Sequence, residues 1–82
     1  MIKSIFAIRD LKANAFTETF DDINDMTAIR RMNALLKINP DVPMFKFPED
    51  FQLFRICTYD MKDGSVTPDF HHVIDFSSIG AE

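Results

Sequence analysis

The chain has 82 residues, of which 46% are hydrophobic and 12% aromatic, and its net charge at pH 7 is −4. This length supports one hydrophobic core, so we expect a single domain over residues 1–82. The negative charge excludes general electrostatic attraction to nucleic acid, because affinity for phosphate comes from Lys and Arg, and the apolar runs are too short for a membrane-spanning helix.

The first predicted element is a strand over residues 2–9. Alternation places Ile2, Phe6 and Ile8 on one face, which we expect to join the core, and it places the remaining side chains on an outer face: Lys3, Ile5, Ala7 and Arg9. From Asp10 to Phe20 no period holds, although Phe16 and Phe20 are regularly spaced in a polar stretch. We therefore expect an ordered loop there.

The clearest predicted element is a helix over about residues 23–38. Its apolar stripe has helical spacing and comprises Ala28, Ile29, Met32, Leu35 and Leu36. Polar residues that cap a helix and favour its positive end crowd its start, namely Asp21, Asp22, Asn24 and Asp25. Lys37 occupies the last turn, and Asn39-Pro40 ends the helix.

Pro40, Pro43 and Pro48 interrupt the next connection, which predicts an extended loop over residues 41–50. The best strand follows over residues 51–59. One of its faces is predicted to hold Phe51, Leu53, Arg55, Cys57 and Tyr59, and the other Gln52, Phe54, Ile56 and Thr58. Because both faces are substantial, this is predicted to be a central or interface strand.

Residues 60–64 predict a hairpin turn in which Gly64 supplies a positive φ, with a return strand over residues 65–67 that Pro68 ends. A further strand at residues 71–76 remains open, and Gly80 to Glu82 are expected to fray. The predicted fold class is α+β: a small, mostly antiparallel sheet in the order β-α-β-β, with room for a further C-terminal strand, packed on one amphipathic helix.

Few residues suggest catalytic or metal chemistry. His71 and His72 are adjacent on a predicted strand, so they point to opposite faces and do not easily share an ion. A nucleophilic pair of Cys57 with either histidine is an alternative, but a lone strand cysteine usually behaves as a small buried hydrophobe. We therefore expect no enzyme, no metal, no cofactor and no small-molecule substrate.

A nucleic-acid-binding face is a second interpretation of the basic residues. Arg30, Arg31 and Lys37 lie off the helical stripe, and Lys3 and Arg9 share the outer face of the first strand. If these cations gather near the predicted shared face of Phe51, Arg55 and Tyr59, they form a platform on which single-stranded bases stack. The alternative is a solvated helix surface, with the rings packed in a core or a dimer interface.

The surplus of apolar side chains predicts a homo-oligomer, most simply a dimer. Cys57 is the single cysteine, so no intramolecular disulfide can form, and a free thiol is typical of a reducing compartment. Arg9, Asp10 and Lys12 interrupt the N-terminal apolar stretch, so no signal peptide is predicted. We expect a cytoplasmic protein.

Several segments resemble the small nonstructural protein family of gokushoviruses, tailless single-stranded-DNA phages of the Microviridae. They are residues 1–13, 27–30, 48–56 and 60–68, among which the Pro-Glu-Asp-Phe stretch before the main strand is the most specific. The resemblance implies a protein of the infected bacterial cytoplasm, absent from the virion, that assists single-stranded-DNA synthesis or packaging by binding that DNA or a replication protein. It assigns no site residue. The alternative is a dimeric protein-interaction adaptor without nucleic-acid affinity.

Overall fold

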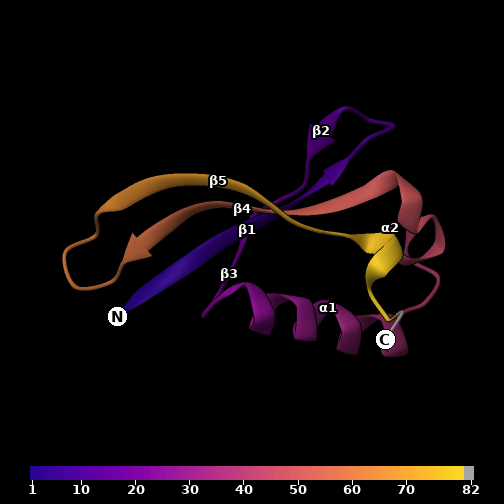
Figure 1. Cartoon of the computed structure of the whole chain (residues 1–82), viewed down its shortest axis with the longest axis horizontal. Coiled ribbons are helices and arrows are strands. Elements are labelled where there is room, and N and C mark those ends of the chain that lie inside the picture. Colours follow the sequence, from indigo (N-terminus) through magenta and orange to yellow (C-terminus); the bar gives the residue numbers. More distant parts are fainter. Residues whose placement is uncertain (81–82) are drawn as a thin grey trace.

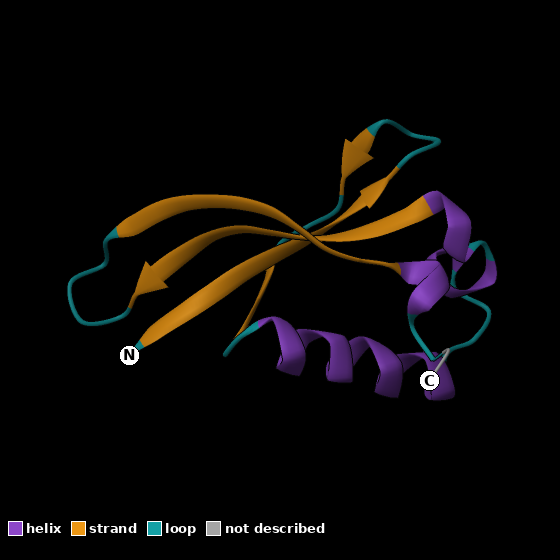
Figure 2. Ribbon diagram, viewed as in Figure 1, coloured by secondary structure: helices purple, strands orange, loops and turns teal. Residues whose placement is uncertain are grey.

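An antiparallel sheet lies on one long helix in the computed structural model, which describes residues 1–80 (Figures 1 and 2). The sheet order is β2-β1-β4-β5, and β3 also pairs with β1. The strands are β1 (Ile2–Asp10), β2 (Ala15–Phe16), β3 (Phe20–Asp22), β4 (Phe51–Asp60) and β5 (Val66–Asp75), and the main helix is α1 (Asp25–Ile38). The predicted α+β class is confirmed. The fraying expected for Ala81 and Glu82 lies outside the described residues.

The segment predicted as a loop at residues 10–20 contains strand structure, so that prediction was wrong. β2 pairs with the C-terminal end of β1 and β3 with its middle, at Ser4 to Phe6, and the chain between β2 and β3 is held by Thr17. The amide of Thr17 donates to the carbonyl of Ile8 at 2.8 Å, and its Oγ1 accepts from the amide of Ile8 at 3.0 Å. These strands are too short to show a sequence period.

Helix α1 begins where its polar start predicts. Asn24 is the N-cap: its side chain accepts from the amide of Thr27 at 2.9 Å, while Thr27 Oγ1 accepts from the amide of Asn24 at 3.1 Å. This reciprocal capping box satisfies two amides that lack partners within the helix. The predicted stripe faces the sheet, with Ala28 and Met32 buried.

The connection predicted as an extended loop at residues 41–50 is instead partly helical. It contains α2 (Pro43–Lys46) and a 3₁₀ turn, η1 (Pro48–Asp50). Pro43 and Pro48 stand in the first turn of α2 and of η1, where the missing amide hydrogen of proline costs no hydrogen bond. Proline therefore starts these elements, and Phe45 within α2 is buried.

β5 runs without interruption through Pro68, which corrects the prediction that this residue ends a short strand. β5 lies at the edge of the sheet, where proline is tolerated, and its pairing with β4 shifts register between Arg55 and Cys57, next to the Cys57–Pro68 pair. The predicted turn before β5 is confirmed, with Gly64 at φ 78°.

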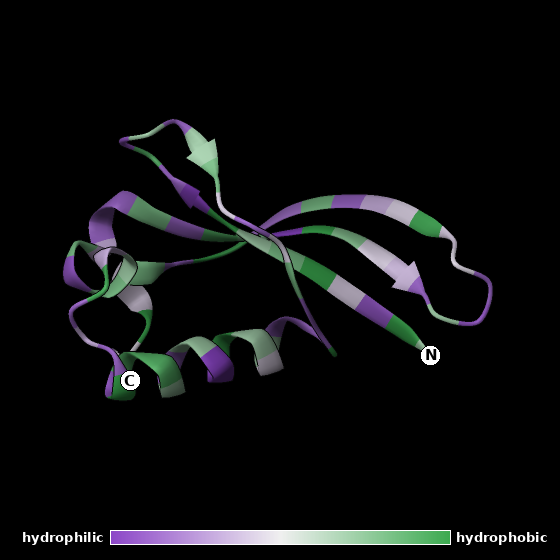
Figure 3. Ribbon diagram, turned by 180° about the vertical axis from the view of Figure 1, so that it is seen from behind, coloured by the Kyte–Doolittle hydropathy of each residue, from purple (hydrophilic) through white to green (hydrophobic). Residues whose placement is uncertain are grey.

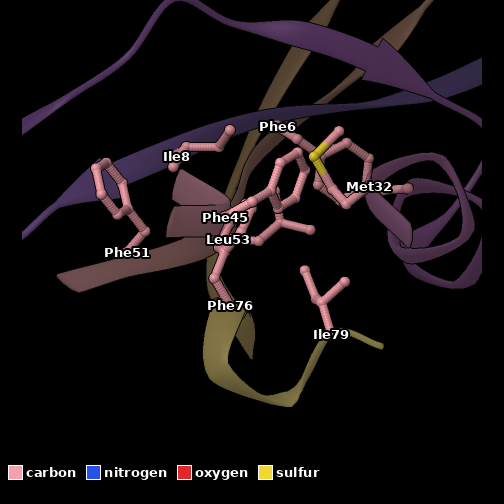
Figure 4. Close-up of a cluster of buried hydrophobic side chains, with 9 residues drawn as sticks. Phe6, Ile8, Met32, Phe45, Phe51, Leu53, Phe76 and Ile79 are labelled. Atoms are coloured by element: carbon pink, nitrogen blue, oxygen red, sulfur yellow. The ribbon is translucent and has the colours of Figure 1, made fainter. Parts of the chain in front are cut away.

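The core lies between the helix-facing side of the sheet and α1, and it closes at the end of the molecule where α2 and the C-terminal turn η2 (Phe76–Ser78) meet (Figure 4). Phe6, Leu53 and Phe76 are fully buried there. The opposite end of the sheet extends beyond the start of α1 (Figure 1). Hydrophobic residues occur along this end of the sheet (Figure 3). Several of them are exposed, among them Ile2, which was predicted for the core but is 61% exposed.

Candidate nucleic-acid interface

A β-bulge divides strand β4 into two parts with opposite facing patterns. Phe6 of β1 pairs with Arg55, but Ile5 pairs with Cys57, so Ile56 is one extra residue. An extra residue reverses which side chains face the helix. The helix side of β4 therefore carries Phe51, Leu53 and Arg55 before the bulge and Thr58 after it.

Tyr59 accordingly lies on the outer side of the sheet, opposite the helix, where it pairs with Lys3. The prediction that Phe51, Arg55 and Tyr59 share one face was wrong. Phe51 is 9% exposed and belongs to the core, so its ring is not available for a ligand. Tyr59 is 37% exposed and remains available.

The predicted cations do not converge on one surface. Arg55 lies between helix and sheet, where Nη1 pairs with Asp25 and Nε with Asp69. Its hydrogen bond to Asp25 raises the pKa of Arg55. Three other predicted cations lie on α1 and are exposed: Arg30, Arg31 and Lys37. Arg31 Nη1 is 3.7 Å from Asp22 Oδ2. Only Lys3, Arg9 and Tyr59 of the predicted set share the outer face.

Three phenylalanines form an outer aromatic cluster on that face: Phe16 of β2, Phe54 of β4 and Phe70 of β5. The rings of Phe54 and Phe70 stack with centroids 4.9 Å apart and planes at 21°. Phe16 meets both edge-on, at 5.6 and 5.9 Å. Phe70 is 63% exposed and Phe16 40%, so a stacked ring surface is open to solvent.

Polar groups border the outer aromatic cluster. The guanidinium of Arg9 lies 5.3 Å from the ring centroid of Phe16, and its Nη2 donates to Asn14 Oδ1 at 2.6 Å. The imidazole of His72 is edge-on to Phe54 at 5.4 Å, and its Nε2 lies 2.8 Å from Asp75 Oδ1. One guanidinium and one imidazole thus flank the rings.

Sequence reasoning missed Phe16, Phe54 and Phe70 as candidate site residues, and it weighed His72 only for a metal site or a nucleophilic pair with Cys57. The signal was present in β5: read as one strand through Pro68, residues 66, 68, 70 and 72 alternate toward one face. In the structure Val66, Pro68 and His72 pair with the outer residues Tyr59, Cys57 and Phe54. Ending the strand at Pro68 hid this alternation.

The histidines and the cysteine lie apart in the sheet register. His71 pairs with Arg55 and His72 with Phe54, whereas Cys57 pairs with Pro68. Within residues 1–80 no group of three or more His, Cys, Asp or Glu side chains is arranged to hold a metal ion. Across the same residues, no helix is long and apolar enough to cross a membrane.

Two surface pockets lie toward the end of the sheet that extends beyond the start of α1. One, of about 320 Å³, is on the helix side and contains the ion pairs of Arg55; it is lined by Ser4, Asn24, Asp25, Met26, Arg55, Thr58 and Asp69. The other, of about 290 Å³, is lined by Lys3, Ile5, Asp21, Tyr59 and Met61. The pairing of Lys3 with Tyr59 places this second pocket on the same side of the sheet as the outer aromatic cluster.

The fold and this face define a small α+β protein that presents exposed aromatic rings on the open side of an antiparallel sheet. The chain belongs to the Phage ORF5 protein family, whose model matches residues 3–79. A phage origin follows from that membership. No curated protein and no solved structure matches the chain.

Proposed function

We propose that the chain is a phage nonstructural accessory protein that assists single-stranded-DNA synthesis or packaging by binding single-stranded DNA on the outer aromatic cluster. The stacked, exposed pair of Phe54 and Phe70 carries the proposal. Unpaired bases stack on such rings whatever their sequence, each contributing about 1–3 kcal/mol. The resemblance to gokushovirus nonstructural proteins supports the role, the host cytoplasm as its place and absence from the virion.

The electrostatics predict binding in which stacking dominates. The outer face of β1 carries two basic side chains, Lys3 and Arg9. The net charge of the chain is −4, so few cations are available to bind phosphate. Each neutralised phosphate of a single strand contributes about −0.7 to the slope of log affinity against log salt. One contact, at Arg9 beside the outer aromatic cluster, gives a slope of about −0.7, and a second contact at Lys3 gives about −1.4; both slopes are shallow, unlike that of a strongly basic protein.

Titration of a labelled thymidine oligonucleotide at low and moderate salt tests the proposal. Phe70→Ala is expected to weaken binding about ten-fold, because one base loses its stacking partner. Phe47→Ala is the matched control: its ring is 49% exposed but lies in the connection after α2, so affinity is expected to be unchanged. Failure of the natural protein to bind at either salt, or equal binding of duplex DNA, contradicts the proposal.

A second candidate function is a dimeric adaptor that binds a second copy or a replication protein without touching DNA. The observation that favours it is the further exposure of apolar residues on the same side of the sheet: Tyr59 is 37% and Val66 60% exposed. Measurement of mass in solution decides here. A dimer that Phe70→Arg converts to a monomer supports the adaptor, whereas a monomeric natural protein counts against it.

A further inference from the structure

We propose that the pocket of about 290 Å³ lined by Lys3, Ile5, Asp21, Tyr59 and Met61 is a second nucleotide subsite for the same DNA strand. In it, Lys3 binds a phosphate and the ring of Tyr59 stacks on a base. This inference rests on the proposed function and adds a site that the outer aromatic cluster does not include. We call this pocket the distal pocket.

The distal pocket is built from three strands and a turn. Lys3 and Ile5 come from β1, Asp21 from β3, where it pairs with Ile5, and Tyr59 from β4. Met61 is fixed beside them because its amide donates to the carbonyl of Met1 at 2.9 Å. The pocket is therefore part of the ordered sheet.

Its lining suits a nucleotide. Ile5, Met61 and the Tyr59 ring supply apolar surface for the face of a base, and Lys3 supplies one cation for a phosphate. Tyr59 and Met61 are 37% and 52% exposed, so the surface is open to a ligand. A single strand that leaves the outer aromatic cluster along β4 meets this pocket next on the same face.

The spacing requires two separate bases. Phe54 and Tyr59 pair with Ala7 and Lys3, which are four positions apart on β1, and at about 3.3 Å per residue this gives a separation of roughly 13 Å. One base cannot stack on both rings, so a strand that fills both subsites spans several nucleotides. A site of about four or more nucleotides is ordinary for a single-strand-binding domain.

Asp21 competes with the phosphate for Lys3. Lys3 Nζ lies 3.0 Å from Asp21 Oδ2, and the two side chains are 33% and 54% exposed. An ion pair this exposed adds little stability, so a phosphate replaces the carboxylate at small cost. Because the displaced carboxylate then repels the phosphate, Asp21 lowers DNA affinity, which a purely structural residue would not do.

The experiment compares a trinucleotide, long enough for one subsite, with a longer oligonucleotide. Tyr59→Ala is expected to weaken binding of the longer oligonucleotide about ten-fold and to leave the affinity for the trinucleotide unchanged. Tyr59→Phe, which keeps the ring, is expected to retain full affinity.

The charged residues are tested by separate variants. Lys3→Ala is expected to reduce the salt slope by about 0.7, and Lys37→Ala on α1 serves as its control. Asp21→Asn is expected to tighten binding about two- to five-fold, whereas Asp41→Asn beyond α1 does not.

The outcomes separate the two proposals. If the natural protein binds no oligonucleotide, both fail. If it binds and Phe70→Ala weakens binding, but Tyr59→Ala, Lys3→Ala and Asp21→Asn leave the longer strand's affinity and salt slope unchanged, the distal pocket is overturned and the outer aromatic cluster stands. Circular dichroism of each variant identifies any loss of binding that results from unfolding.

Discussion

Arg55 of β4 forms an ion pair with Asp25, the first residue of helix α1, and so joins the centre of the sheet to the start of the helix. Its Nε also donates to Asp69 Oδ2 of β5 at 3.0 Å. The Arg55 side chain is only 20% exposed. One guanidinium therefore connects three elements, which explains why it is not free to bind a ligand.

Arg55→Ala is expected to destabilise the fold by about 1–3 kcal/mol, because it leaves the partly buried carboxylate of Asp25 without its partner. Arg30→Ala is the control: Arg30 is exposed on α1, so the change is expected to stay within about 0.5 kcal/mol. Urea unfolding of the two variants measures the difference. Equal midpoints would show that the ion pair adds no stability.

Thr27→Val tests the start of α1. Thr27 Oγ1 donates to Asp22 Oδ1 at 2.6 Å, and this hydrogen bond holds the pKa of Asp22 below its usual value of 3.8. Loss of the hydroxyl also breaks the capping box, so we expect a cost of about 1 kcal/mol at neutral pH.

The cost of Thr27→Val is expected to depend on pH. A carboxyl whose pKa is lowered by folding stabilises the protein above its unfolded pKa and loses that contribution as pH falls through the folded pKa. The gap between natural and variant protein therefore narrows below pH 3.8, the usual value for Asp22. Urea unfolding across pH measures this gap, with Thr67→Val on exposed β5 as control. A gap that widens in acid would contradict the assigned hydrogen bond.

Phe76→Ala and Phe70→Ala are expected to differ sharply although both remove a ring near the C-terminus. Phe76 is 2% exposed and contacts the rings of Phe45 and Phe51, so its loss leaves a cavity that costs about 3–5 kcal/mol. Phe70 is 63% exposed and loses mainly its stacking on Phe54, which costs about 1 kcal/mol. Thermal unfolding compares them, and similar losses would contradict the assignment of Phe70 to an open face.

The sequence predicted those elements whose signals are local. The apolar stripe from Ala28 to Leu36 and the polar start at Asn24 predict both ends of α1 to within one helical turn. Alternation over residues 51–59 defines β4 in the same way. Pro68 misled the prediction because a proline stops a central strand but not an edge strand, and position in the sheet depends on distant pairing.

The candidate site was harder to predict because it depends on register. The extra residue at Ile56 exists only relative to β1, so no pattern within β4 places Tyr59 on the side opposite Phe51. The partners of Arg55 are likewise remote, since Asp25 lies 30 residues earlier and Asp69 14 residues later. Sequence reasoning found the ring and cation types but assigned several of them to the wrong face.

Gly64→Ala tests the turn that supports the distal pocket. Gly64 has φ 78°, and a Cβ added there would meet no atom within 4 Å, so any cost comes from the backbone alone. We expect about 1 kcal/mol for alanine and less for Gly64→Asn, because asparagine tolerates this conformation. Lys62→Ala, in the same turn, serves as control.

Urea unfolding measures these costs, and amide exchange follows the turn itself. The amide of Gly64 donates to the carbonyl of Asp60 at 2.8 Å, and that of Asp60 to the carbonyl of Ser65 at 2.9 Å. A strained turn opens more often, so Gly64→Ala is expected to speed exchange at Asp60 and at the neighbouring Met61, which lines the distal pocket. Equal costs for alanine and asparagine would show that the positive φ does not limit this turn.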